Sequence, residues 1–275
     1  MDFDKWPAAD KDRVLRYLAN GGYRSPRYRI FYVSTPKVAC TTMKWWFAAL
    51  EGKTRRLRAI TESAESDPDL IIHGYNFQAV APEVTGLPAD VLESILGSGD
   101  YFRFGLVRNP YKRIFSAWQS KMLLQEPLQI TPYLDMEFLR HPIETRAQVA
   151  AAFEAFLEHL ASAEAPNFWD LHWTPQADLL RPDLIDYSKI IQLENPDEIE
   201  AQLNAWTGEH LVSPFIGKRR NESLIPYATE FITDRSAALI AQIYARDFEL
   251  FGYDLKLPAG AITLRTYSSR WRSRR

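Results

Sequence analysis

Short apolar runs alternate with amphipathic stretches along most of this chain. Three of the runs are rich in aromatic and β-branched residues, which is typical of buried strands, and they cover residues 28–34, 101–107 and 188–193. Each run is followed within a few residues by apolar positions at helical spacing. Repeated strand-then-helix units predict an α/β fold in which helices flank a central parallel sheet.

Helix signals follow these runs closely. The pairs Asn109-Pro110 and Asn195-Pro196 both predict a helix start, because Asn is a good N-cap and Pro suits the first helical position. Glu198 stands in the capping-box position of the second helix. Three further segments are predicted to be helical: 88–96, 147–160 and 233–251. A shorter run, Leu70 to Ile72, is interpreted as a strand whose end exposes His73.

Composition bounds the possible classes of protein. The 275 residues are 46% apolar, contain no internal repeat or flexible linker, and predict a single domain over 1–260 followed by a basic tail over 261–275. The apolar runs are too short to span a membrane, and the charged N-terminus lacks the apolar stretch of a signal peptide. A lone cysteine, Cys40, excludes an intramolecular disulfide framework. These features favour a cytoplasmic location, and a net charge of −2 argues against a chain that binds nucleic acid over its whole surface.

The segment from Tyr28 to Lys44, YRIFYVSTPKVACTTMK, reads as a strand, a turn and the start of a helix. A strand that turns directly into a helix N-terminus collects unpaired N–H groups and the positive end of the helix dipole, which together bind anions. Lys37 adds a charge, and Thr41 and Thr42 add hydroxyl donors. An ordinary strand-to-helix joint with a solvated lysine is the alternative. The absence of glycine from this segment disfavours a standard nucleoside-triphosphate loop.

A second anion site is predicted in the segment RNPYKRIFSAWQSK, residues 108–121. Arg108 offers a planar fork of donors, the helix start offers backbone N–H groups, and Ser116 offers a hydroxyl two turns later. The alternative here is a capped helix with a solvated basic face.

Together, and about 70 residues apart, the two segments resemble a known family. Pro36 to Thr42 with Lys44 resembles the 5′-phosphosulfate loop of the Golgi-type carbohydrate sulfotransferases, and RNPYKR with Ser116 resembles their 3′-phosphate-binding element. Softer similarities to the chondroitin and dermatan enzymes occur at DLHWTPQ (170–176), at LEN (193–195) and at YARDFELFGY (244–253). The resemblance therefore spans nearly the whole chain.

This resemblance implies transfer of a sulfuryl group from 3′-phosphoadenosine 5′-phosphosulfate (PAPS) to a hydroxyl, on a fold related to the nucleotide kinases. Lys37 is then the catalytic lysine, and Arg108 and Ser116 hold the 3′-phosphate. A basic loop late in the family's chains implies that Lys218, Arg219 and Arg220 close over it, although a solvated loop is the alternative. The residues implied for the 5′ end of the donor are Pro36, Lys37, Val38, Ala39, Cys40, Thr41 and Thr42.

The acceptor hydroxyl needs a general base. His73 is the first candidate, because it resembles the histidine between the two donor motifs of the heparan 2-O-sulfating relatives, and His172 in DLHWTPQ is the second. A hydrogen-bonded structural role is the alternative for both, and it is the expectation for His141, His159 and His210. No His/Cys cluster has metal-ligand spacing, so no metal is expected.

The family's membrane anchor and multiple cysteines have no counterpart here, which favours a soluble, bacterial relative whose acceptor is a carbohydrate, a glycolipid or a small molecule. Two other classes stay open. One is a non-catalytic protein that binds anions or nucleic acid, or contacts a membrane, through the five arginines of the tail. The other is a kinase on the same fold, which the missing Gly-rich loop disfavours.

Overall fold

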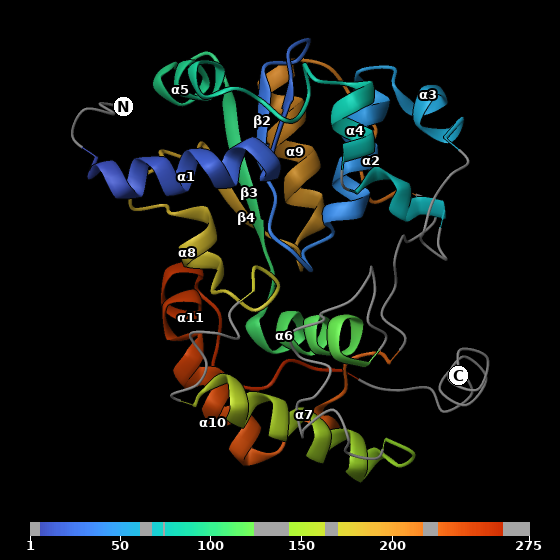
Figure 1. The fold of residues 1–275 in the computed structure, drawn as a ribbon, viewed down its shortest axis with the longest axis vertical. Helices are drawn as coiled ribbons and strands as arrows, with labels where there is room; N and C mark the ends of the chain where they lie inside the picture. Colours follow the sequence, from blue (N-terminus) through green and yellow to red (C-terminus); the bar gives the residue numbers. More distant parts are fainter. Residues whose placement is uncertain are drawn as a thin grey trace. The chain divides into compact units, whose positions relative to one another are not determined.

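The computed structural model describes residues 6–60, 68–73, 75–123, 143–162, 170–216 and 225–260 (Figure 1). The chain divides into two compact units, each built from two segments. The first unit comprises Met1–Val107 and Gln176–Asn221, and the second comprises Arg108–Pro175 and Glu222–Arg275. A single domain over 1–260 stays a prediction, and the tail over 261–275 lies outside the described residues.

A four-stranded sheet in the order β1-β2-β3-β4 forms the centre of the first unit. Its strands are β1 (Gly22–Ser25), β2 (Ile30–Val33), β3 (Phe102–Val107) and β4 (Lys189–Gln192). Strand β1 runs antiparallel to β2, while β2, β3 and β4 run parallel, with Val33 opposite Gly105 and Val107 opposite Gln192. The three predicted strands and the α/β class are therefore confirmed.

Strand β1 was not predicted, because its sequence, GYRS, begins with a glycine that reads as a turn and is too short to show alternation. Pairing along β2, from Gly22 opposite Val33 to Ser25 opposite Ile30, determines its conformation instead. Because β2, β3 and β4 are parallel, their carboxyl ends lie at one edge of the sheet, and ligands of such sheets bind at that edge.

The helices of the first unit are α1 (Ala8–Gly21), α2 (Cys40–Leu50), α3 (Thr54–Arg58), α4 (Tyr75–Val80), α5 (Ala89–Gly97), α8 (Gln176–Leu180) and α9 (Pro196–Thr207). The core between α2 and the sheet is aromatic. The ring of Tyr32 lies 5.1 Å from that of Phe104 and 6.1 Å from that of Phe47, and all three side chains are fully buried. This packing holds α2 against the sheet.

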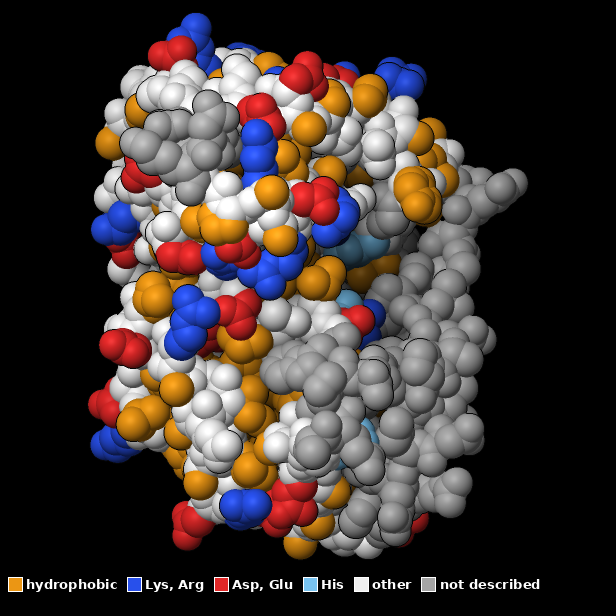
Figure 2. Space-filling model, turned by 60° about the vertical axis from the view of Figure 1, so that its left-hand side comes forward, with side chains coloured by type: hydrophobic (Ala, Val, Ile, Leu, Met, Phe, Trp, Pro, Cys, Tyr) orange, Lys and Arg blue, Asp and Glu red, His pale blue; other side chains and the backbone are white. Residues whose placement is uncertain are grey.

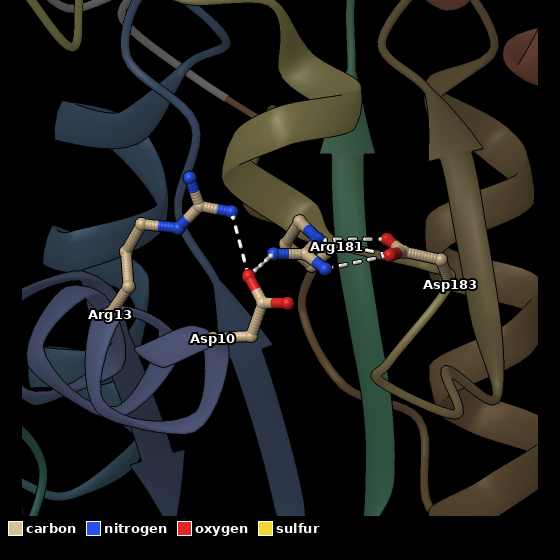
Figure 3. Close-up of polar contacts among 4 residues, drawn as sticks. All are labelled: Asp10, Arg13, Arg181 and Asp183. Atoms are coloured by element: carbon tan, nitrogen blue, oxygen red, sulfur yellow. Dashed lines mark hydrogen bonds and ion pairs between the residues drawn. The ribbon is translucent and has the colours of Figure 1, made fainter. Parts of the chain in front are cut away.

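Arg181, which follows α8, attaches α1 to the rest of this unit (Figure 3). Its guanidinium donates to Asp10 of α1 at 2.8 Å and to both carboxylate oxygens of Asp183, and Asp10 also accepts from Arg13. A planar guanidinium suits this arrangement, since it can address two carboxylates at once.

The prediction that Leu70 to Ile72 forms a strand is wrong. This segment belongs to a 3₁₀-helix, Pro68–Ile72, and His73 follows it with its N–H bonded to the Leu70 carbonyl at 2.9 Å. Leu70, Ile71 and Ile72 are all buried, against the alternation expected of a half-exposed strand. Trp45 of α2 holds the turn by donating to the Asp69 carbonyl at 2.9 Å.

The prediction that Asn195 and Glu198 cap the N-terminus of α9 is also wrong. The helix does begin at Pro196, but the Asn195 side chain makes no cap hydrogen bond. Its amide donates to the Glu198 carboxylate at 3.1 Å, and Glu198 pairs with Lys189 of β4 at 2.9 Å. Cross-element pairing therefore replaces the capping box at this position.

The second unit is helical over its described residues. It contains α6 (Pro110–Trp118), a π-helical turn (Gln119–Leu123), α7 (Arg146–Leu160), a 3₁₀-turn (Thr229–Phe231), α10 (Asp234–Ile243) and α11 (Ala245–Phe251). An aromatic core joins α6 to α7 and to the 3₁₀-turn, where Phe115 packs edge-on against Phe153 at 5.2 Å and stacks on Phe231 at 5.4 Å. No helix among the residues described in either unit is long and apolar enough to cross a bilayer.

The single helix predicted over 233–251 is two helices, α10 and α11. Tyr244 lies between them with ψ at 24°, and its hydroxyl donates to the Trp173 carbonyl at 2.7 Å. The apolar pattern runs on through the break, so it does not reveal a contact made 71 positions away in the chain.

Candidate active site

The loop between β2 and α2 turns through two residues in left-handed conformation. Lys37 has φ 65° and Ala39 has φ 52°, and between them Val38 is fully buried, with its N–H bonded to the Thr35 carbonyl at 3.2 Å. This conformation costs a residue other than glycine about 1–3 kcal/mol and is concentrated at functional sites. A loop without glycine can therefore still form the tight turn that an anion site needs.

Helix α2 begins directly after this loop, and its N-cap residue, Ala39, makes no side-chain cap hydrogen bond. Its first turn, Cys40 to Met43, contains no acidic residue. The first N–H groups of a helix have no intrahelical partner and carry the positive end of the dipole. The loop and helix start are thus suited to an anion such as the 5′-phosphosulfate of PAPS.

His73 meets the first two turns of α2. Its Nε2 lies 2.9 Å from the hydroxyl of Thr41, and its Nδ1 lies 3.1 Å from Nζ of Lys44. Thr41 and Lys44 are three positions apart and therefore share a helix face. The structure brings together the predicted loop, the predicted histidine and a lysine whose role the sequence did not reveal.

Lys44 also lies over the ring of Tyr23, 5.4 Å from its centroid. Burial opposes the charge on Lys44, but the neighbouring Tyr23 and Cys40 outweigh it, and the pKa of Lys44 is raised above its ordinary value. Lys44 is therefore an ammonium group at neutral pH.

The second predicted anion site begins as expected. Asn109 caps α6 by accepting from the N–H of Tyr111 at 3.1 Å, and Pro110 is the first helical residue. Arg108, which follows β3, is half-buried, and Ser116 is buried within α6.

Arg113 of the same helix is not on a solvated basic face, because it is only 1% exposed. Its guanidinium donates to the carbonyl of Thr174 at 2.8 Å and to that of Leu171 at 3.2 Å. Arg113 therefore holds the turn over residues 170–174. The two carbonyls that it contacts lie about 60 positions from Arg113 in the chain.

His172 in this turn is paired with Asp170. The Asp170 carboxylate accepts from the backbone N–H of His172 at 2.8 Å and contacts Nδ1 of its ring. Burial would raise the pKa of Asp170, but the hydrogen bonds and charge of His172 outweigh it, and the pKa is lowered. A carboxylate at Nδ1 favours the tautomer in which Nε2 is basic. Sequence spacing alone, with Asp two positions before His, could have suggested this pair.

One set of predicted residues remains outside these descriptions. Lys218, Arg219 and Arg220 lie outside the described residues. Lys37 belongs to the first unit and Arg108 to the second, so each is described within its own unit. No group of three His, Cys, Asp or Glu side chains that could hold a metal ion occurs in the part of the chain that the structure describes.

Residues 23–254 match the model of the sulfotransferase family. The chain belongs to this family. It is similar to carbohydrate sulfotransferase 10 of Xenopus laevis, with 26% identity over 261 residues that cover 87% of this chain and 69% of the relative. For the human protein of the same name the identity is 28% over 260 residues, covering 87% and 68%. Mouse carbohydrate sulfotransferase 12 is 24% identical over 270 residues, covering 90% and 64%. No solved structure matches the chain.

These findings confirm the predicted family, the α/β fold class and the assignment as a PAPS-dependent sulfotransferase. The relatives named above are vertebrate proteins, so they do not support a bacterial origin for this sulfotransferase. That origin and the cytoplasmic location stay expectations. On the face drawn in Figure 2, basic and acidic side chains of the described residues are interspersed. The alternative that depends on the five arginines of the tail stays a prediction, because that segment lies outside the described residues.

Proposed function

We propose that this sulfotransferase moves a sulfuryl group from PAPS to a hydroxyl of a carbohydrate acceptor. The observation that carries the proposal is the loop after β2, in which Lys37 and Ala39 take left-handed conformations directly before the N-terminus of α2. The names of the relatives, carbohydrate sulfotransferases 10 and 12, support the acceptor class. A glycolipid headgroup presents the same kind of hydroxyl.

The resemblance to the family implies that the donor is held at its two anionic ends, and each end is described within its own unit. The loop over Pro36 to Thr42 surrounds the 5′-phosphosulfate, where Lys37 and the first N–H groups of α2 stabilise the charge that develops as the bond from sulfur to the 5′-phosphate oxygen breaks. Arg108 and Ser116 hold the 3′-phosphate, since a guanidinium fork and a hydroxyl suit its oxygens.

His172 removes the acceptor proton. The acceptor oxygen forms its bond to sulfur while its proton passes to Nε2 of His172, and 3′-phosphoadenosine 5′-phosphate (PAP) leaves. The Asp170 carboxylate supports this role because it orients the ring and stabilises the imidazolium that forms. His73, first by sequence resemblance, becomes the less favoured base because both of its ring nitrogens contact polar groups of α2.

The test combines binding with transfer. PAP should raise the melting temperature of the full chain, and Lys37→Ala and Arg108→Ala should reduce that rise. Labelled sulfate should pass from PAPS to members of a panel of glycans and glycolipids. Absence of a thermal shift with both PAP and PAPS, together with no transfer to any acceptor, would overturn the proposal.

A further inference from the structure

The contacts of His73 use both of its ring nitrogens. Nε2 lies 2.9 Å from the Thr41 hydroxyl, and Nδ1 lies 3.1 Å from the Lys44 ammonium. Thr41 is only 3% exposed, and its hydroxyl makes no other hydrogen bond among the residues that the structure describes. The imidazole is thus fixed between two side chains of one helix.

The charge of Lys44 decides where the ring proton lies. An ammonium group has only donors, so it donates to Nδ1, and Nδ1 must be the acceptor nitrogen. A neutral imidazole with its lone pair at Nδ1 carries its proton at Nε2. That N–H donates to the oxygen of Thr41, which leaves the hydrogen of the Thr41 hydroxyl available for another acceptor.

The same contacts argue against His73 as the base. Its one lone pair accepts from Lys44, and a proton added at Nδ1 would place an N–H against an ammonium group 3.1 Å away. Thr41, by contrast, lies in the first turn of α2, where an anion would meet the helix N-terminus.

We propose that His73 is a positioning residue that turns the Thr41 hydroxyl into a donor to the 5′-phosphate of the sulfuryl donor, while Lys44 fixes the imidazole tautomer. This role rests on the function proposed above. It separates His73 from proton removal and predicts that the residue acts through affinity for the nucleotide more than through the rate of transfer.

The deciding experiment compares His73→Gln with His73→Ala in the full-length enzyme, since a glutamine amide can donate to Thr41 and accept from Lys44 but cannot remove a proton. We expect His73→Ala and Thr41→Val each to weaken PAP binding about 10- to 100-fold, the usual effect of losing a hydrogen bond to a charged group. His73→Gln should restore most of the affinity and keep kcat within about fivefold of wild type. His73→Ala should add little in the Thr41→Val background, because the two side chains act as one unit. His210→Gln, at an exposed position, is the matched control.

Two other results would overturn the role. A kcat that falls about 10²–10⁴-fold in His73→Gln with unchanged PAP affinity would identify His73 as the base. PAP affinity unchanged in His73→Ala would show that the contact does not serve the nucleotide. If the wild-type enzyme does not bind PAP, the proposed function itself fails. If it binds PAP and His73→Ala binds PAP equally well, only the positioning role of His73 fails.

An independent readout is the tautomer itself. Long-range ¹H–¹⁵N correlation spectra at neutral pH should show His73 protonated at Nε2 and unprotonated at Nδ1, and Lys44→Met should remove this preference. A proton on Nδ1 in the wild-type enzyme would contradict the proposal whether or not the protein transfers sulfate.

Discussion

Two histidines in this sulfotransferase have opposite surroundings. His73 meets an ammonium group at Nδ1 and a hydroxyl at Nε2, and both partners come from α2. His172 meets a carboxylate at Nδ1, and that carboxylate also accepts from its own backbone N–H. The cation beside the first ring opposes a second proton, whereas the anion beside the other stabilises one. Residue type alone therefore does not identify a base, and the charge at Nδ1 separates the two roles.

The largest effect should come from His172→Gln. If His172 takes the acceptor proton, kcat should fall about 10²–10⁴-fold while PAP affinity stays near that of wild type. Transfer assays and PAP titrations on the same preparation measure both quantities. A normal kcat in His172→Gln would show that His172 is not the base, and the two histidines would then no longer differ in their proposed roles.

Asp170→Asn should have the next largest effect, with kcat lowered about 100-fold, because an amide no longer stabilises the imidazolium or selects its tautomer. The kcat–pH profile of the variant should also shift, and a merely structural role for Asp170 would not move it. An unchanged profile with an unchanged kcat would show that the pair does not take part in transfer.

The same carboxylate should make stability depend on acid pH. The pKa of Asp170 is lowered from its ordinary value of 3.8, so its contribution to the unfolding free energy is present above that value and is lost as pH falls through the lowered folded-state pKa. In urea unfolding between about pH 5 and about pH 2, the unfolding free energy of Asp170→Asn should therefore fall less steeply with decreasing pH than that of wild type. Asp100→Asn, at an exposed position, is the control and should keep the wild-type slope.

Arg113→Met should reduce the unfolding free energy by roughly 2 kcal/mol, because it leaves the part-buried carbonyls of Leu171 and Thr174 without their charged donor. The turn that carries His172 would loosen, so kcat should fall while the tautomer of His73 stays as in wild type. Denaturant unfolding and the His73 spectrum measure the two outcomes, with the exposed Arg16→Met as control. A change in His73 would show that the two histidine regions are not independent.

Tyr244→Phe should have the smallest effect, about 1 kcal/mol in unfolding free energy, since it removes one hydrogen bond to the Trp173 carbonyl. Tyr75→Phe is a matched control, because Tyr75 is 85% exposed. If kcat falls in Tyr244→Phe by more than the loss of stability explains, the turn over residues 170–174 needs the hydrogen bonds of both Arg113 and Tyr244.

Much of the fold could be predicted because its strands are continuous apolar runs and its helices have strong start signals. Strand β3 and the start of α6 at Pro110 are examples, since the signals that predict both lie in neighbouring residues. Strand β1 and the break at Tyr244 could not be predicted, because partners distant in the chain determine them. The run Leu70 to Ile72 was too short for its periodicity to distinguish a strand from a 3₁₀-turn.

The candidate site divides in the same way. The loop around Lys37 is visible in sequence because its chemistry is local. The side chains that select a role for each histidine are Lys44 and Asp170. Contact geometry was needed to recognise Lys44, whereas the spacing of Asp170 and His172 could have suggested the second pair. Arg113 shows the limit most clearly, because a motif rich in basic residues reads as a surface while this guanidinium is buried under carbonyls.

The left-handed residues of the loop after β2 also bear on turnover. A glycine at Lys37 or Ala39 would adopt the same shape without strain, but it would also explore many others before the nucleotide arrives. With Lys37 and Ala39 at these positions, the conformational cost falls on folding, once in the life of each molecule. Each catalytic cycle then begins with a receptor that is already shaped, so little ordering of the backbone is left for the donor to impose.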